Sequence, residues 1–363
     1  MDTLAGRLPA DTDTRTLRMS QYVRQFDRTP APDGNSEPPS SYGLGPSGNF
    51  LIGKERVTIP DEPLEETDFK NCVPTAMARL AQAWQAKAWD AATGQTITRL
   101  TLNRTLDIYE KVSPFRRKAI TDPSTDRAEK EVNKIKIEKI EADKGAGRDI
   151  AARTEDHNDY GVSLLQALKR WTDRDTKPLD GLLPEADYFL EVEPRNLDQL
   201  REAVWRFGGV LLGLALPLSI QLPPEKKHDA QPQQETQAAQ AMLGSPQEKD
   251  ISKLKVQEDW FVPGYGPIAD GAPGSLSSHC VAITGYTPRA FYCFSDGLVR
   301  TLSEEFVLAY TEECFAVLSR DVLADYADLR TSMQKDVEKL RKQDRPPWMP
   351  NFTQRWRGGN IMH

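Results

Sequence analysis

The stretch Ser278-His279-Cys280-Val281-Ala282-Ile283-Thr284-Gly285-Tyr286 places a histidine at the start of an apolar run. A Gly/Pro/Ser-rich loop at residues 264–278 precedes it and a turn at residues 287–289 follows it, which together predict a strand. Of the four histidines, only His279 lies at the mouth of a strongly predicted strand. It is therefore our candidate catalytic histidine; the alternative is a structural histidine with satisfied hydrogen bonds.

A second informative position lies more than two hundred residues earlier, at Cys72. The residues after Asn71 predict a helix, because apolar side chains recur on one helical face: Val73, Ala76, Met77, Leu80 and Trp84. Asn71 suits the N-cap position, and Pro74 is tolerated in a first turn. A thiol at a helix N-terminus is favoured as thiolate, and an adjacent imidazole would complete its activation. The alternative is that Cys72 is a small buried apolar residue.

The other predicted elements divide the chain into a helical half and a sheet half. Helices are predicted at residues 102–111, 164–171 and 197–207, with strands at 188–192 and 210–216. Further strands are predicted at 278–286, 290–294, 298–302 and 314–318, with a capped short helix after Ser303 and a long polar helix at 321–343. This order predicts an α+β fold.

Composition sets the boundaries of the chain's organisation. We expect an extended N-terminal arm at residues 1–60 and a main domain at 61–320. We expect charged or polar insertions at about 114–156 and 223–258, and a C-terminal helix with an aromatic and basic tail at 321–363. That tail contains Trp348, Phe352, Arg355, Trp356 and Arg357.

Composition also limits the compartment and the partners. The net charge of −7 argues against a nucleic-acid binder. No secretory signal is visible, and the longest nearly apolar run, residues 208–220, is too short to span a bilayer. The four cysteines have neither zinc-site nor disulfide-scaffold spacing, so Cys280 and Cys293 are expected to be buried thiols in a reducing compartment. We expect a cytoplasmic protein or one incorporated in a particle, without a cofactor, metal or membrane partner.

The motifs around Cys72 and His279 resemble those of the papain-like cysteine peptidase fold. Asn71-Cys72-Val73-Pro74-Thr75-Ala76 resembles the cysteine motif at the start of the family's central helix, and residues 278–286 resemble its histidine strand. The chain is most similar to predicted papain-fold proteins of phages and prophages, over most of residues 1–320 apart from the insertions. The resemblance implies that Cys72 is the nucleophile and His279 the general acid/base.

The chain departs from the family pattern at two helper positions. Glu66 stands where the family usually has a glutamine that donates to the oxyanion, and losing one such donor costs about 10²–10³ in rate. Aligning the motifs places Phe294 where the family has its asparagine. We select Asp296 as the residue that orients His279, with Ser295 as the weaker choice; Asp296-Gly297 could instead serve only as a turn.

Two functions follow from these observations. The first is a cysteine peptidase or amidase of low activity, acting on a peptide or protein substrate through Cys72, His279 and Asp296. The second is an inactive papain-fold protein with a structural or interaction role, such as a component of a phage-derived particle. Its insertions and tail would then contact a protein partner or the assembled particle.

Overall fold

The computed structural model describes residues 16–26, 37–45, 49–52, 55–58, 70–88, 101–115, 161–221, 258–295, 298–324 and 326–343. Nearly all of the two expected insertions lies outside these ranges, as do the C-terminal tail, Glu66 and Asp296.

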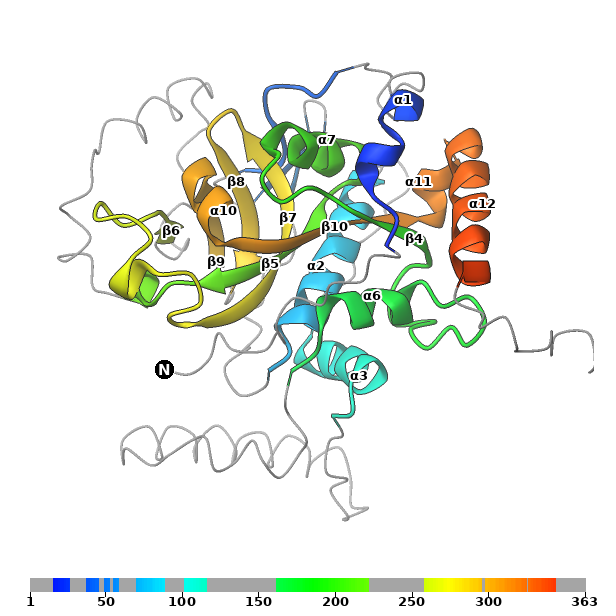
Figure 1. Cartoon of the computed structure of the whole chain (residues 1–363), viewed down its shortest axis with the longest axis horizontal. Helices are drawn as coiled ribbons and strands as arrows, with labels where there is room; N and C mark the ends of the chain where they lie inside the picture. The colour runs from blue at the N-terminus through cyan, green and yellow to red at the C-terminus, as the bar shows by residue number, and fades with distance from the viewer. Residues whose placement is uncertain are drawn as a thin grey trace, which may run out of the picture.

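One large sheet organises the described part of the chain (Figure 1). Its main path runs β3-β2-β1-β7-β5-β10-β4, and β8 joins β7 to β9, which also pairs with β6. The strands are β1 (Tyr42–Leu44), β2 (Asn49–Ile52), β3 (Glu55–Thr58), β4 (Ala186–Glu191), β5 (Val210–Leu216), β6 (Glu258–Trp260), β7 (Ser277–Thr287), β8 (Ala290–Ser295), β9 (Leu298–Ser303) and β10 (Thr311–Ser319). Every one of these pairings is antiparallel except β6 with β9. The predicted α+β class is confirmed.

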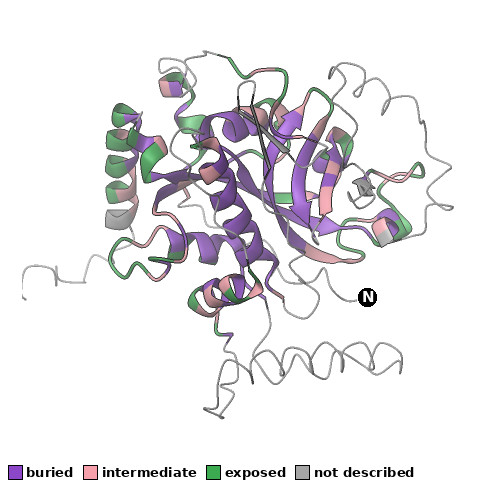
Figure 2. Cartoon of the chain, turned by 180° about the vertical axis from the view of Figure 1, so that it is seen from behind, coloured by how far each residue is buried: buried purple, intermediate pink, exposed green. Residues whose placement is uncertain are grey.

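Helices cover both faces of the central strands. These strands are coloured mostly as buried in Figure 2. On one face pack α2 (Cys72–Lys87), α3 (Leu102–Val112) and α6 (Leu164–Trp171). On the other pack η1 (Met19–Gln21), α1 (Val23–Phe26), α7 (Leu197–Phe207), α10 (Glu304–Tyr310), α11 (Arg320–Ala324) and α12 (Ala327–Gln343). Because both faces are covered, every residue of β5 is buried.

Alternation along β5 and β7 assigns each side chain to one of the two cores. Leu212 and Leu214 belong to the α7 side, whereas Leu211 belongs to the α2 side. On β7, Val281 likewise faces the α7 side, and Cys280 faces the α2 side. This alternation decides which residues around His279 can meet.

The predicted elements agree with the structure except at the C-terminus. The single polar helix predicted for residues 321–343 is wrong in one respect, because the chain forms α11 and α12. The amide of Tyr326 donates to the Leu323 carbonyl at 3.2 Å, a tight turn that redirects the chain between the two helices. Within the described ranges, the helices are too short or too polar to cross a bilayer.

Candidate functional site

Cys72 is the first residue of α2, as predicted, and its side chain is buried. Asn71 occupies the N-cap position but makes no side-chain hydrogen bond to the helix. Its Nδ2 instead donates to Thr105 Oγ1 on α3 at 3.5 Å, and both side chains are fully buried. The expectation that Asn71 caps α2 through its side chain is therefore wrong, and the positive end of the helix beside Cys72 lacks that cap.

Two contacts fix how α2 lies along β7. A Cβ on Gly209 would come within 2.7 Å of Leu80 Cδ1 and 2.8 Å of the Ile283 carbonyl oxygen, so both lie against Gly209. Further along, Lys87 Nζ lies 5.6 Å from the ring centroid of Tyr42, whose strand partner is Tyr286. The helix and the strand therefore run side by side in the same direction.

This alignment brings Cys72 level with His279. Cys72 precedes Leu80 by eight helical residues, a rise of about 12 Å. His279 precedes Ile283 by four strand residues, a rise of about 13 Å. Cys72 also shares a buried cluster with Cys280, the residue after His279. The structure thus places the segments that carry the two candidate residues at the same end of the α2–β7 pair. Their side chains lie on different faces of the sheet: His279 pairs with Leu214 and faces the α7 side, whereas Cys72 lies on the α2 side.

His279 is buried, and the side chains near its ring include Ser295 and Trp260. Its Nε2 lies 3.1 Å from Ser295 Oγ at the end of β8. The ring of Trp260, from β6, packs edge-on with its centroid 6.2 Å away. The sequence analysis did not single out Trp260 as a candidate site residue, although it begins the segment that leads to the histidine strand.

Ser295, rather than its neighbours, is the described residue of β8 that reaches the histidine. Phe294 points to the α2 side, where its ring lies 4.8 Å from the Arg79 guanidinium carbon. Phe294, which the motif alignment placed at the asparagine position, therefore faces away from His279, because adjacent strand residues face opposite sides of a sheet. Asp296, the orienter we predicted, lies outside the described residues.

The remaining thiols are buried and form no disulfide, as predicted for Cys280 and Cys293. Burial, with a smaller contribution from Glu313, raises the pKa of the Cys314 thiol well above its usual value. Cys280, Cys293 and Cys314 can therefore serve as internal references for the reactivity of Cys72. In the part of the chain that the structure describes, no group of three or more His, Cys, Asp or Glu side chains could hold a metal ion.

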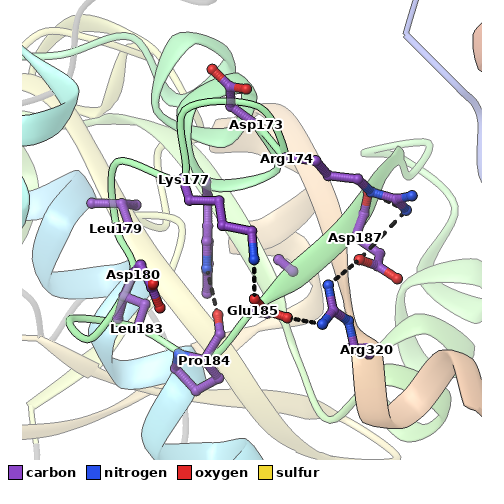
Figure 3. A pocket seen from close by; sticks show the side chains of 12 residues that line it. Asp173, Arg174, Lys177, Leu179, Asp180, Leu183, Pro184, Glu185, Asp187 and Arg320 are labelled. Carbon is purple, nitrogen blue, oxygen red and sulfur yellow. Dashed lines mark hydrogen bonds and ion pairs between the residues drawn. The ribbon is translucent and has the colours of Figure 1, made fainter.

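A surface hollow lies apart from the candidate site, between the loop after α6 and α11 (Figure 3). Asp187 and Glu185 point into a set of cationic side chains there, including Arg174, Lys177 and Arg320. Because acidic and basic side chains pair with one another in this hollow, we interpret it as a structural ion-pair network rather than a binding site.

Comparisons with known proteins give little sequence evidence. No protein-family model matches the chain, and no curated protein is similar to it. Among solved structures, the chain is similar to xylellain, described as a cysteine protease from Xylella fastidiosa. The two share 11% identity with a TM-score of 0.42, over 88% of this chain and 97% of that one. A likeness of this degree does not by itself assign an activity.

Proposed function

We propose that the protein is a papain-like cysteine peptidase or related amidase of low activity. Cys72 is the nucleophile, His279 is the general acid/base, and Ser295 helps to position the imidazole. The observation that supports the proposal is the alignment of α2 on β7, which puts Cys72 and His279 at the same end of this pair. Catalysis then requires the His279 side chain, which faces the α7 side of β7, to reach Cys72 around the end of the strand.

The chemistry follows from these assignments. The Cys72 thiolate attacks the substrate carbonyl, and the Cys72 backbone amide donates to the oxyanion that forms. His279 gives its proton to the leaving amine, which departs as a thioester forms. His279 then takes a proton from water as the water oxygen attacks the thioester carbonyl, and the C–S bond breaks to release the carboxylic acid and the Cys72 thiolate beside the imidazolium. No metal or organic cofactor enters this scheme.

Two features argue for low activity. Glu66 at the usual glutamine position cannot donate to an oxyanion when ionised, a loss of about 10²–10³ in rate. A serine hydroxyl can either donate to or accept from Nε2, so Ser295 does not fix the imidazole tautomer as an acceptor would. Asp296 remains our proposed additional orienter, immediately after Ser295.

Alkylation by iodoacetamide at pH 6, read residue by residue by mass spectrometry, tests the proposal without knowing the substrate. An unperturbed cysteine is less than about 1% thiolate at this pH. We expect Cys72 to react at least tenfold faster than cysteine in solution and than Cys280, Cys293 or Cys314. His279→Ala should abolish the excess, and His228→Ala should not. Labelling of Cys72 no faster than cysteine in solution would refute the peptidase.

That negative result would favour the second candidate, an inactive papain-fold interaction protein. Two observations support it. The candidate side chains are buried, with Cys72 5% exposed, His279 1% and Ser295 2%, and Cys72 and His279 lie on opposite faces of the sheet. In this role the protein would bind a protein partner or an assembled particle through residues 114–156, 223–258 and the C-terminal tail. Co-purification of the intact chain with a particle, lost on deleting residues 344–363, would support it.

A further inference from the structure

Two buried polar atoms at the N-terminus of α2 have no hydrogen-bond partner among the residues that the structure describes. They are Asn71 Oδ1 and Thr75 Oγ1. Asn71 is 0% exposed and Thr75 3%, so bulk solvent does not reach either side chain. A buried polar group without a partner costs free energy, and proteins commonly satisfy such groups with an ordered water molecule. Both residues are close in sequence to Cys72, the candidate nucleophile.

The orientation of the Asn71 side-chain amide follows from its neighbours. Thr105 Oγ1 donates its single proton to the Leu102 carbonyl at 2.8 Å, so toward Asn71 it can only accept. Nδ2 of Asn71 is therefore the atom that faces Thr105, and Oδ1 is left as a buried acceptor. An N-cap side chain usually accepts from the second or third helical residue. The third is Pro74, which has no N–H, and Asn71 makes no side-chain bond to Val73 either.

Thr75 lies one turn further along the helix, beside both Asn71 and Cys72. Helical side chains lean toward the N-terminus, and residues three or four positions apart have Cβ atoms about 5–6 Å apart. The Thr75 amide donates to the Asn71 carbonyl at 3.0 Å, so this spacing applies here. A water molecule that bonds two polar atoms spans roughly 5–6 Å between them. One water can therefore bridge Asn71 Oδ1 and Thr75 Oγ1.

We propose that Asn71 and Thr75 hold a water molecule against the Cys72 thiol, and that Thr75 is a positioning residue for this nucleophile. The water accepts from the Thr75 hydroxyl and donates to Asn71 Oδ1 and to the sulfur. A hydrogen bond to a thiolate favours the charged form of the thiol. A neutral molecule that both donates and accepts fits two uncharged polar atoms better than an ion does. The effect on catalysis rests on the proposed function, but the water site itself does not.

A crystal structure that resolves ordered waters tests the site directly. We expect one water within about 3.2 Å of both Asn71 Oδ1 and Thr75 Oγ1 in the unsubstituted protein. Thr75→Val keeps the shape of the side chain and removes its hydroxyl, so it should lose the water and lower the urea midpoint of unfolding. If the hydroxyl has no partner at all, the same substitution should leave that midpoint unchanged or raise it, because it removes an unsatisfied polar group.

The pH–rate profile for alkylation of Cys72 by iodoacetamide tests the positioning role. We expect Thr75→Val to raise the midpoint of this profile by about one pH unit, and Thr75→Ser, which keeps the hydroxyl, to restore it. Thr284→Val is the matched control on β7. Thr284 is also buried, and its hydroxyl also has no partner among the described residues, but it lies five strand residues beyond His279. This control should leave the midpoint unchanged.

The two parts of the inference can fail separately. Absence of the water from the unsubstituted protein, or a Thr75→Val protein at least as stable as it, would overturn the water site. A midpoint that Thr75→Val leaves unchanged, that Thr75→Ser does not restore, or that Thr284→Val shifts equally would overturn the role of Thr75 toward Cys72. If the water is present but Cys72 labels no faster than cysteine in solution, the peptidase fails and the water site stands.

Discussion

At the scale of single residues, the hydrogen bond between His279 and Ser295 gives the most direct test of the candidate site. Ser295→Ala removes a bond that is worth roughly 1.5–3 kcal/mol if the imidazole is charged. We therefore expect about tenfold slower alkylation of Cys72 at pH 6. Ser319→Ala is the control, because this buried serine at the end of β10 accepts a hydrogen bond from the Val322 amide of α11, away from His279. If both variants label like the unsubstituted protein, Ser295 does not position His279.

The side chain of Asn71 affects the same thiol from the helix side. Asn71→Asp places a carboxylate at the N-terminus of α2, next to Cys72, where its charge opposes formation of a thiolate. We expect the midpoint of the pH–rate profile for alkylation to rise by about one pH unit. Asn196→Asp makes the same change at the N-cap of α7, where Asn196 accepts from the Gln199 amide. An equal shift in both variants would mean a general effect on the fold.

The register of β8 explains why the contact between Ser295 and His279 could not be predicted from the sequence. The apolar patterns were enough to predict β7 and β8 and to single out His279. They did not show which of two adjacent β8 residues faces the histidine, because facing depends on the pairing of the two strands. That pairing shifts between Ile283 and Gly285, which moves Ser295 rather than Phe294 to the histidine side.

At the scale of elements, the carboxylate of Asp187 on β4 connects three neighbouring segments. Its side chain is 0% exposed and lies 3.4 Å from Arg174, 3.5 Å from Arg320 and 3.2 Å from Arg330. These arginines come from the loop after α6, from α11 and from α12 (Figure 3 shows the first two). This cluster could not be predicted from the sequence. Its members are far apart in the chain, and charged side chains do not belong to the apolar patterns from which the helices and strands were predicted.

Asp187→Asn tests how much this cluster stabilises the fold. Removing one partner of a buried ion pair costs several kcal/mol, but the half-exposed arginines can rehydrate. We therefore expect a loss of about 1–3 kcal/mol in the free energy of unfolding by urea. Asp198→Asn is the matched control, since Asp198 pairs with Arg201 at 98% exposure and should cost less than about 0.5 kcal/mol. Similar losses in both variants would show that burial gives Asp187 no special role.

Glu185, two residues earlier, makes the stability of this region depend on pH. A hydrogen bond from Lys177 and the nearby charge of Arg320 hold the pKa of Glu185 below its usual 4.5. Because the folded pKa is lower than the unfolded one, its contribution is present above pH 4.5 and disappears as the pH falls through the folded pKa. Glu185→Gln and Lys177→Ala should each be less stable than the unsubstituted protein at pH 7, and this difference should shrink at pH 3. A difference that is the same at both pH values would contradict this assignment.

At the scale of the whole molecule, the first described segment, residues 16–26, is hydrogen-bonded to the last helix, α12. The Tyr22 hydroxyl donates to Asp336 Oδ2 at 2.8 Å, and Gln25 Nε2 donates to Ser332 Oγ at 3.1 Å. Phe26 packs edge-on against Tyr326, with ring centroids 6.4 Å apart. This part of the N-terminal arm, predicted for residues 1–60, is therefore held by residues some three hundred positions away.

A double-mutant cycle on Tyr22→Phe and Asp336→Asn measures this long-range connection. Burial and the bond to Asp336 raise the pKa of Tyr22, so the tyrosine stays neutral and donates to a charged acceptor. We expect a coupling of about 1–2 kcal/mol in the free energy of unfolding. The exposed pair Gln334 and Glu338 within α12, 3.3 Å apart, is the control and should couple by less than about 0.5 kcal/mol. A coupling near zero for Tyr22 and Asp336 would mean that the two ends of the chain do not stabilise each other, and that the sheet core alone holds the candidate site.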